Sequence, residues 1–177
     1  MSSAGSHPGD APPTDGEALL TLSGVKQTLG GNEILAGVDM VIRDRVREGQ
    51  VTGQVVSLLG PSGVGKTRLL RIIAGLDEPD AGTVQGQRGV PLRAGSVGVV
   101  FQDYPLLRHR TALGNLLVAG AAAGLDDAAA QKRALGLLKR FGLDGRAGHY
   151  PAQLSGGQRQ RVAIAQQLMV PRSLLLM

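Results

Sequence analysis

The stretch GPSGVGKT, Gly60 to Thr67, fits the pattern G-x-x-x-x-G-K-[ST] without a mismatch. The apolar segment GQVVSLLG begins at Gly53, directly before this stretch, and is predicted to be a strand buried on both faces. The segment KTRLLRIIAGL follows from Lys66, and its apolar residues recur at helical spacing: Leu69, Ile72, Ile73 and Leu76. A buried strand, a glycine-rich loop and a helix in this order predict a loop that binds phosphate.

Each residue type in this loop has a physical reason. Glycines let the backbone approach a phosphate closely, and the N–H groups of the loop and helix terminus then face the anion. Lys66 is expected to reach the β- and γ-phosphates of a nucleotide, and the Thr67 hydroxyl to bind Mg²⁺. The residues predicted to bind the nucleotide are Gly60, Pro61, Ser62, Gly63, Val64, Gly65, Lys66 and Thr67. The loop alone does not separate kinases, GTPases, helicases and transporters.

Composition excludes several other classes of protein. The chain has 177 residues, 42% hydrophobic and 19% charged, which is typical of a globular domain. It has no cysteine, which excludes disulfides and thiolate metal sites, and its three histidines are too scattered for a zinc site. The net charge is +5, but the arginines are spread along the chain and aromatic residues make up 2%. With so few aromatic side chains on which bases could stack, no nucleic-acid partner is expected.

The amino-terminal segment, residues 1–17, is rich in Ser, Gly, Pro and Asp and is predicted to be a disordered tail. It lacks the basic and apolar regions of a signal peptide. No apolar run in the chain is long enough to span a bilayer. We therefore expect one domain over residues 18–177, located in the cytosol or on the cytosolic face of a membrane.

The rest of the chain alternates between strand and helix patterns. Three further segments are predicted to be strands: ALLTLSGV from Ala18, VDMVI from Val38 and SVGVVF from Ser96. The region from Tyr104 to about Tyr150 is predicted to be helical, with an apolar stripe of Ala134, Leu137, Leu138 and Phe141 that stops at Gly142. This alternation predicts an α/β domain with a largely parallel sheet and a helical insert.

A second candidate anion site begins at Leu154 with LSGGQRQRVAIAQQL. Ser155 is a natural helix cap, and Gly156 and Gly157 leave the backbone N–H groups uncovered. Val162, Ala165 and Met169 then fall on one helix face. Taken alone, SGG is typical of an ordinary capped helix, but the whole stretch is far more specific.

LSGGQ resembles the signature motif of the ATP-binding cassette (ABC) ATPases. VVFQDYPLL, Val99 to Leu107, resembles their Q-loop with Gln102 as its glutamine, and GPSGVGKT then corresponds to their Walker A motif. Motif order and spacing also match, and the resemblance covers about Leu19 to Met177. It implies a P-loop NTPase core of the ABC ATPase type with an antiparallel β-subdomain and a helical subdomain at about residues 104–153.

The resemblance also implies roles for individual residues. Lys66 and Gln102 would be catalytic, with Thr67 and Gln102 contacting Mg²⁺ beside a bound ATP. The γ-phosphate of an ATP held by a second subunit would meet four signature residues: Ser155, Gly156, Gly157 and Gln158. Two ATPase subunits would then form a head-to-tail dimer that is docked on transmembrane permease subunits, as a peripheral protein on the cytoplasmic face of the membrane.

Three features depart from the family pattern. Leu29 stands where an aromatic residue usually stacks on adenine, so stacking beyond plain burial is not expected. RDRVREGQVT, residues 43–52, is longer than a tight hairpin. The final LLLM matches the apolar residues before the Walker B Asp–Glu pair, so we expect the carboxyl-terminal part of the domain, with these acids, to be missing.

Three functions remain open at this point. The first is the ATP-binding subunit of an ABC transporter, most simply an importer, in which ATP hydrolysis drives solute transport. The second is a non-catalytic, nucleotide-binding fragment of such a subunit, with ATP hydrolysis near background because the acidic pair is missing. The third is a soluble ABC ATPase that serves ribosomes or DNA.

Overall fold

The structure is a computed structural model that describes residues 14–47, 53–101 and 103–177. The chain forms two compact units, Met1–Ala94 and Gly95–Met177. The division falls ahead of the helical subdomain predicted at about residues 104–153. Each unit is described by itself below.

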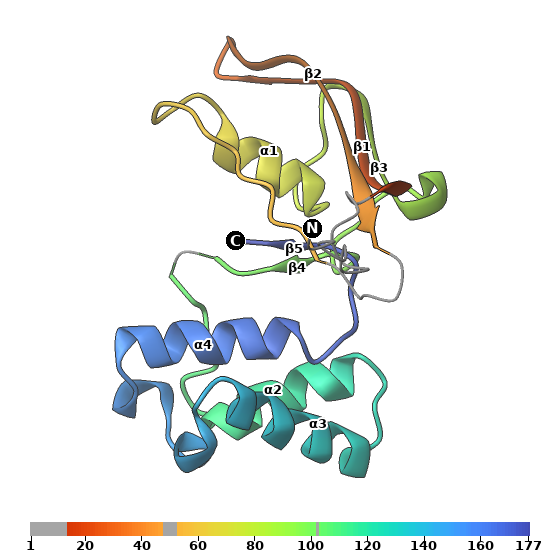
Figure 1. The fold of residues 1–177 in the computed structure, drawn as a ribbon. Coiled ribbons are helices and arrows are strands. Elements are labelled where there is room, and N and C mark those ends of the chain that lie inside the picture. The colour runs from red at the N-terminus through yellow and green to blue at the C-terminus, as the bar shows by residue number, and fades with distance from the viewer. Residues whose placement is uncertain (1–13, 48–52, 102) are drawn as a thin grey trace, which may run out of the picture. The chain divides into compact units, whose positions relative to one another are not determined.

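The first unit contains a three-stranded antiparallel sheet in the order β2-β1-β3, with β1 Thr14–Leu29, β2 Asn32–Val46 and β3 Ala81–Gly86. Figure 1 shows β1 and β2 as a long hairpin. Its turn consists of Gly30 and Gly31, whose φ angles of 58° and 81° match a two-residue turn with both φ positive. Both strands predicted in this region, from Ala18 and Val38, lie inside the hairpin. β1 begins at Thr14, inside the segment predicted to be a tail, whose residues 1–13 lie outside the described part.

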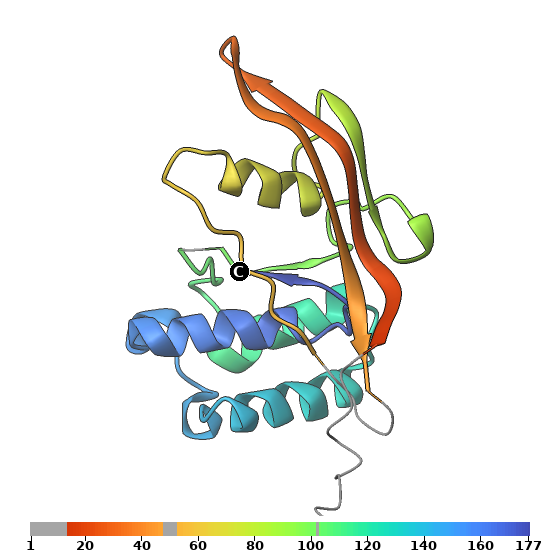
Figure 2. The same ribbon diagram turned by 45° about the horizontal axis from the view of Figure 1, so that its top comes forward.

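Side chains from β1 and β2 form the buried face of this sheet. Leu20, Leu22, Val25 and Leu35 are each at most 5% exposed. The β1–β2 register shifts at several points, for example between Leu22 and Val25, and Figure 2 shows the hairpin bending along its length. Such irregularities increase strand twist and let a long hairpin curve over a core.

Helix α1, Lys66–Ile73, follows the phosphate loop as predicted. Leu69, Ile72 and Ile73 are buried, but Leu76, which was predicted to lie on the same helix, falls beyond its end and is 42% exposed. The helix ends earlier because Gly75 adopts a φ of 68° and the Leu76 N–H donates to the Arg71 carbonyl. This is the glycine-terminated bonding pattern that closes many helices. Gly75 also approaches the backbone closely, since a Cβ there would lie 2.4 Å from the Arg93 carbonyl carbon.

The segment before the phosphate loop contradicts one prediction. Residues 53–60 form no strand and pair with none of the described strands. Val55 is 89% exposed and Leu59 is 91% exposed. A strand buried on both faces needs a hydrogen-bonded neighbour and covering side chains, and the described residues supply neither here.

The second unit contains a parallel pair, β4 Gly98–Val99 and β5 Leu175–Leu176. β4 lies within the strand predicted from Ser96 but is shorter, and β5 lies in the final LLLM. The unit also contains three α-helices: α2 Ala112–Ala122, α3 Asp127–Arg140 and α4 Gly156–Gln167. The short 3₁₀ helices are η2 Asp144–Arg146 and η3 Pro151–Gln153 here, and η1 Gln87–Gly89 in the first unit.

One cluster of buried side chains holds these helices together. Its members come from α2, α3, α4 and their flanking turns: Ala112, Leu116, Ala130, Ala134, Leu138, Leu143, Leu154, Val162, Ala165 and Met169. Leu137 and Phe141 pack against it partly buried, so the predicted stripe on α3 is confirmed. The predicted face of α4 is confirmed for Val162 and Ala165, which are fully buried, whereas Met169 is buried but lies beyond the end of the helix. In the described part of the chain, no helix has the length and apolar character needed to cross a membrane.

Candidate functional site

The phosphate loop is positioned by glycines in left-handed backbone conformations. Gly63 has a φ of 84° and Gly65, the residue that caps α1, a φ of 95°. A Cβ on Gly65 would lie 3.0 Å from the Ile34 carbonyl oxygen and 3.0 Å from Leu35 Cδ2, so the loop passes close against β2. At Gly63 a Cβ would meet nothing within 4 Å. One glycine is therefore needed for packing, and the other leaves open space where an anion can approach.

Lys66 closes the loop on itself. Its ammonium donates to the carbonyl oxygens of Gly60 at 2.8 Å and Pro61 at 2.6 Å. The side chain therefore spans from the first turn of α1 to the start of the loop, and its charge lies beside the helix amino terminus. A mobile ammonium and uncapped helix N–H groups together suit a polyphosphate.

The other predicted loop residues are accessible to a ligand. Ser62, Val64 and Thr67 are exposed, and Val64 is 50% exposed. Thr67 lies in the first turn of α1, where its hydroxyl can reach an ion held against the phosphates. The described residues contain no cluster of three or more His, Cys, Asp or Glu side chains that could bind a metal ion. Binding of Mg²⁺ by the Thr67 hydroxyl stays a prediction.

A carboxylate that the motif reasoning missed lies just beyond α1. Asp77 Oδ2 accepts from Arg68 Nη1 at 2.9 Å and from Arg71 Nε at 2.7 Å, and Asp77 Oδ1 accepts from Arg71 Nη2 at 2.8 Å. Hydrogen bonding to Arg71 and then to Arg68 lowers the pKa of Asp77 to about 2, against the opposing effect of burial. The same contacts raise the pKa of Arg71. In the sequence, the spacing R-x-x-R-x₅-D around the end of the helix is the pattern that could have indicated this ionic cluster.

The signature helix α4 begins with a reciprocal cap. The Gln158 N–H donates to Ser155 Oγ at 3.3 Å, and the Ser155 N–H donates to Gln158 Oε1 at 2.8 Å. Ser155 was predicted to cap this helix and does so, while the partnership with Gln158 was missed. Gly157 leaves its surroundings open, since a Cβ there would meet nothing within 4 Å. Contact of these residues with a phosphate stays a prediction.

Gln102 lies outside the described residues, and the segment after it is held by hydrogen bonds to α2. Tyr104 has a positive φ of 45°. Asn115, fully buried on α2, accepts from the Leu107 N–H at 2.7 Å. The two hydrogens of its Nδ2 are shared among three carbonyl oxygens, those of Leu107, Arg110 and Thr111. Asn115 therefore fixes the path of residues 107–111. Sequence reasoning missed it, because a lone Asn in a helix is more often exposed.

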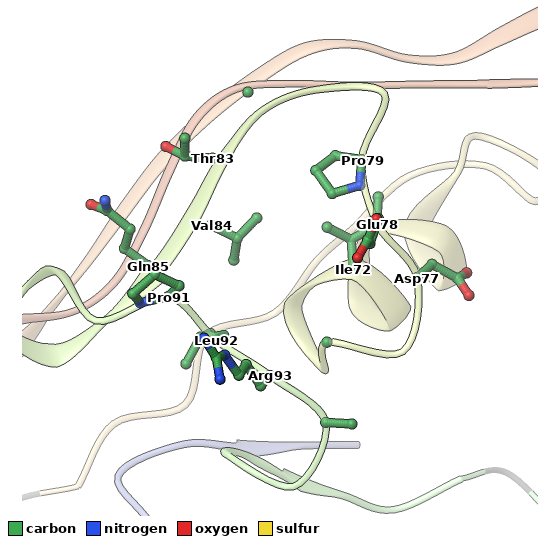
Figure 3. Close-up of a pocket in the computed structure, with 13 residues that line it drawn as sticks. Ile72, Asp77, Glu78, Pro79, Thr83, Val84, Gln85, Pro91, Leu92 and Arg93 are labelled. Carbon is green, nitrogen blue, oxygen red and sulfur yellow. The ribbon is translucent and has the colours of Figure 1, made fainter.

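Two other features of the first unit do not belong to the phosphate loop. A pocket of about 350 Å³ is lined by α1, the following turn, β3 and residues 91–94, including Ile72, Val84 and Leu92 (Figure 3). No residue of the loop lines it. Leu29, predicted to meet adenine, is the last residue of β1 and is 50% exposed. That contact also stays a prediction.

The sequence matches a known family over most of its length. A profile of the family described as ABC transporter matches residues 46–177. The lipoprotein-releasing system ATP-binding protein LolD of Bacteroides thetaiotaomicron is 39% identical over 160 residues, which cover 85% of this chain and 70% of LolD. This chain belongs to the ABC transporter family, among its ATP-binding subunits. The resemblance stated from LSGGQ and the Q-loop segment is confirmed.

Further relatives agree with this assignment. The sulfate/thiosulfate import ATP-binding protein CysA of Bordetella bronchiseptica is 49% identical over 134 residues, 71% of this chain and 38% of CysA. The solved structure of cbiO1 from Clostridium perfringens, part of the ABC transporter complex cbiONQ, matches with a TM-score of 0.75 and 26% identity over 90% of this chain and 64% of that one. A second ATP-binding subunit of an ABC transporter matches with a TM-score of 0.74. The α/β fold of the ABC ATPases, predicted from the motifs, is thereby confirmed.

Proposed function

We propose that this ABC family chain binds MgATP through the phosphate loop and serves as the ATP-binding subunit of a transporter of the importer class. The observation that carries the proposal is the bridge from Lys66 to the Gly60 and Pro61 carbonyls, across a loop with left-handed glycines at Gly63 and Gly65. An incoming phosphate offers Lys66 a stronger, charged acceptor than two carbonyls.

The loop residues then have separate roles. N–H groups from Ser62 to Thr67 hold the phosphate oxygens, and Lys66 neutralises charge on the β- and γ-phosphates. Thr67, through its hydroxyl, and Gln102 would hold Mg²⁺. The bound ion would supply charge neutralisation on the phosphates.

The partners follow from the same assignment. The helix dipole and the glycines at Gly156 and Gly157 suit the γ-phosphate of ATP in a second copy, which makes a head-to-tail dimer dependent on ATP. Transmembrane permease subunits would place the dimer on the cytoplasmic face of the membrane. Support for transport comes from the relatives, since CysA is named an import protein and cbiO1 is part of a transporter complex.

The binding step is tested by calorimetric titration of the purified 177-residue chain with MgATP. We expect saturable binding that Lys66→Ala abolishes or weakens by at least about tenfold, since a charge-assisted contact is lost. Lys26→Ala is the matched control, because Lys26 is an exposed lysine in the same unit and lies outside the loop. Equal ATP affinity of Lys66→Ala and the unaltered chain would sink the proposed site.

The transport role is tested by affinity purification of the tagged protein from its own cells. Recovery of a permease, with solute uptake lost in Lys66→Ala cells, is the expected result. Recovery with ribosomes and no membrane protein would instead favour a soluble ABC ATPase.

A further inference from the structure

The strongest ionic cluster outside the phosphate loop is built on Asp77. Its carboxylate engages both Arg68 and Arg71, and its side chain is only 18% exposed. The contact with Arg71 is bidentate, with one bond to each carboxylate oxygen. Such paired bonds fix geometry as well as charge. Nothing in the proposed nucleotide chemistry uses this cluster directly.

The cluster runs along α1 rather than across it. α1 has eight residues, which at 1.5 Å per residue makes a helix about 12 Å long. Arg68 lies in its first turn, two residues after Lys66, whereas Asp77 lies beyond its carboxyl end. Helical side chains lean toward the amino terminus, so Arg68 reaches against this tendency to meet Asp77. The ion pair therefore ties the phosphate-facing turn to the far end of the helix.

A short helix with a functional amino terminus needs such a tie. Helices of this length are not stable by themselves, and α1 has no side-chain cap at Gly65. At its other end, Gly75 is held against the backbone of Arg93. Asp77 lies two residues after Gly75 and is thus attached to a fixed part of the unit. Its hydrogen bond with Arg68 can therefore hold Arg68 in a fixed position as well. Its low pKa keeps the carboxylate charged throughout the physiological pH range.

We propose that Asp77 is a positioning residue for the phosphate loop, acting through Arg68 and Arg71 to fix the first turn of α1 and hence Lys66. The inference rests on the proposed function, because it concerns the same nucleotide site. Asp77 does not touch the nucleotide in this scheme. Its removal lets the first turn of α1 and the Lys66 ammonium move relative to the phosphates.

The test compares dissociation constants of MgATP and of inorganic tripolyphosphate for the whole chain at low temperature. Asp77→Asn keeps the size of the side chain but removes its charge, and it should weaken both ligands by roughly two- to fivefold, the value of a partly exposed ion pair. Asp77→Glu, which restores the charge, should recover most of the affinity. Glu78→Gln, an exposed neighbour, is the matched control and should change neither constant.

A purely structural role is separated by a second control. Leu138→Ala destabilises the other unit, so it should lower the melting temperature without changing either dissociation constant of the folded protein. If Asp77→Asn behaves in the same way, the inference is wrong.

If Asp77→Asn does not fold, Arg68→Gln takes its place, because the bidentate bond from Arg71 remains. It should weaken both ligands by about twofold, and an unchanged constant would overturn the inference. Failure of the unaltered chain to bind ATP would refute the proposed function instead.

Discussion

The two units begin their helices in opposite ways. In the second unit a side-chain oxygen caps each α-helix: Thr111 accepts from Gly114 N–H at 3.0 Å, Asp126 from Ala129 N–H at 2.8 Å and Ser155 from Gln158 N–H at 3.3 Å. α1 in the first unit begins at Gly65, which has no side chain to offer. Among the described α-helices, the one whose amino terminus is left without a side-chain cap is the one that follows the phosphate loop.

The difference shows how a sequence separates stability from function. A capped amino terminus has satisfied part of its own hydrogen-bonding need, so it stabilises the helix but keeps fewer N–H groups for a ligand. At α4 the cap uses the Gln158 N–H and not those of Gly156 and Gly157, where the γ-phosphate contact is proposed. An uncapped one loses that stabilisation and keeps its N–H groups for an anion. The ion pairs of Asp77 and the packing of Leu69, Ile72 and Ile73 hold α1 in place of a cap.

The largest expected effect on stability comes from truncating a buried side chain of the second unit, compared with an exposed side chain of the first. Leu138 is fully buried in the second unit, whereas Val55 is 89% exposed before the phosphate loop. Leu138→Ala should cost about 2–5 kcal/mol, because it removes contacts and leaves a cavity. Val55→Ala should change stability by less than about 0.5 kcal/mol. Urea unfolding followed by circular dichroism measures both, and a cost of several kcal/mol at Val55 would show that residues 53–60 form a buried strand.

A pair of glycines tests the uncapped start of α1. Gly65→Ala should cost about 1–2 kcal/mol from left-handed strain alone, with more from contact with Ile34, and should weaken ATP binding. Gly136→Ala is the control, because Gly136 lies inside α3 and a Cβ there would meet nothing within 4 Å. It should stabilise the protein by about 0.5–1 kcal/mol. Thermal unfolding gives both values, and equal signs would contradict the assigned conformations.

The sequence predicted the helices better than the strands, for a physical reason. Helical hydrogen bonds are local, so the stripe on α3 and the cap at Ser155 follow from residues within a few positions of each other. The segment 53–60 has the composition of a buried strand, but burial depends on partners elsewhere in the chain. The prediction that the helix continues to Leu76 was wrong for a different reason. Gly75 ends the helix, and this glycine could be seen in the sequence.

The residues of the candidate site also differ in how well the sequence predicts them. The loop from Gly60 to Thr67 is a local motif, and its glycine conformations could be predicted from spacing. Asp77 and Asn115 were missed, because the role of each depends on which groups the neighbouring turn brings within hydrogen-bonding distance. Asn115 in particular is informative only once its burial is known.

A smaller effect tests the capped helices. Asp126→Ala removes the bond that Asp126 accepts from the Ala129 N–H and should cost about 1 kcal/mol. Asp127→Ala is the control, because Asp127 lies in the first turn of α3 but is not its cap, and a charge there interacts with the helix dipole by a few tenths of a kcal/mol when exposed. Chemical unfolding compares the two variants. A larger cost at Asp127 would mean that the dipole, rather than the cap, stabilises the start of α3.

The smallest expected effect on stability is the pH dependence of the ion pair that links Asp77 to Arg68 and Arg71 along α1. The pKa of Asp77 is lowered to about 2 in the folded protein, against about 3.9 for an unperturbed aspartate. The ion pair therefore stabilises the fold fully above about pH 4, and this contribution is lost as the pH falls toward 2. Because Arg68 and Arg71 are 36% and 41% exposed, solvent screening limits the contribution of the ion pair to about 1 kcal/mol or less.

Melting temperatures from pH 6 to pH 2.5 should fall less steeply for Asp77→Asn than for the unaltered chain, with Glu78→Gln as the control for net charge. Parallel curves would mean that Asp77 has the same proton affinity folded and unfolded, and that the tie holds α1 through geometry without adding stability.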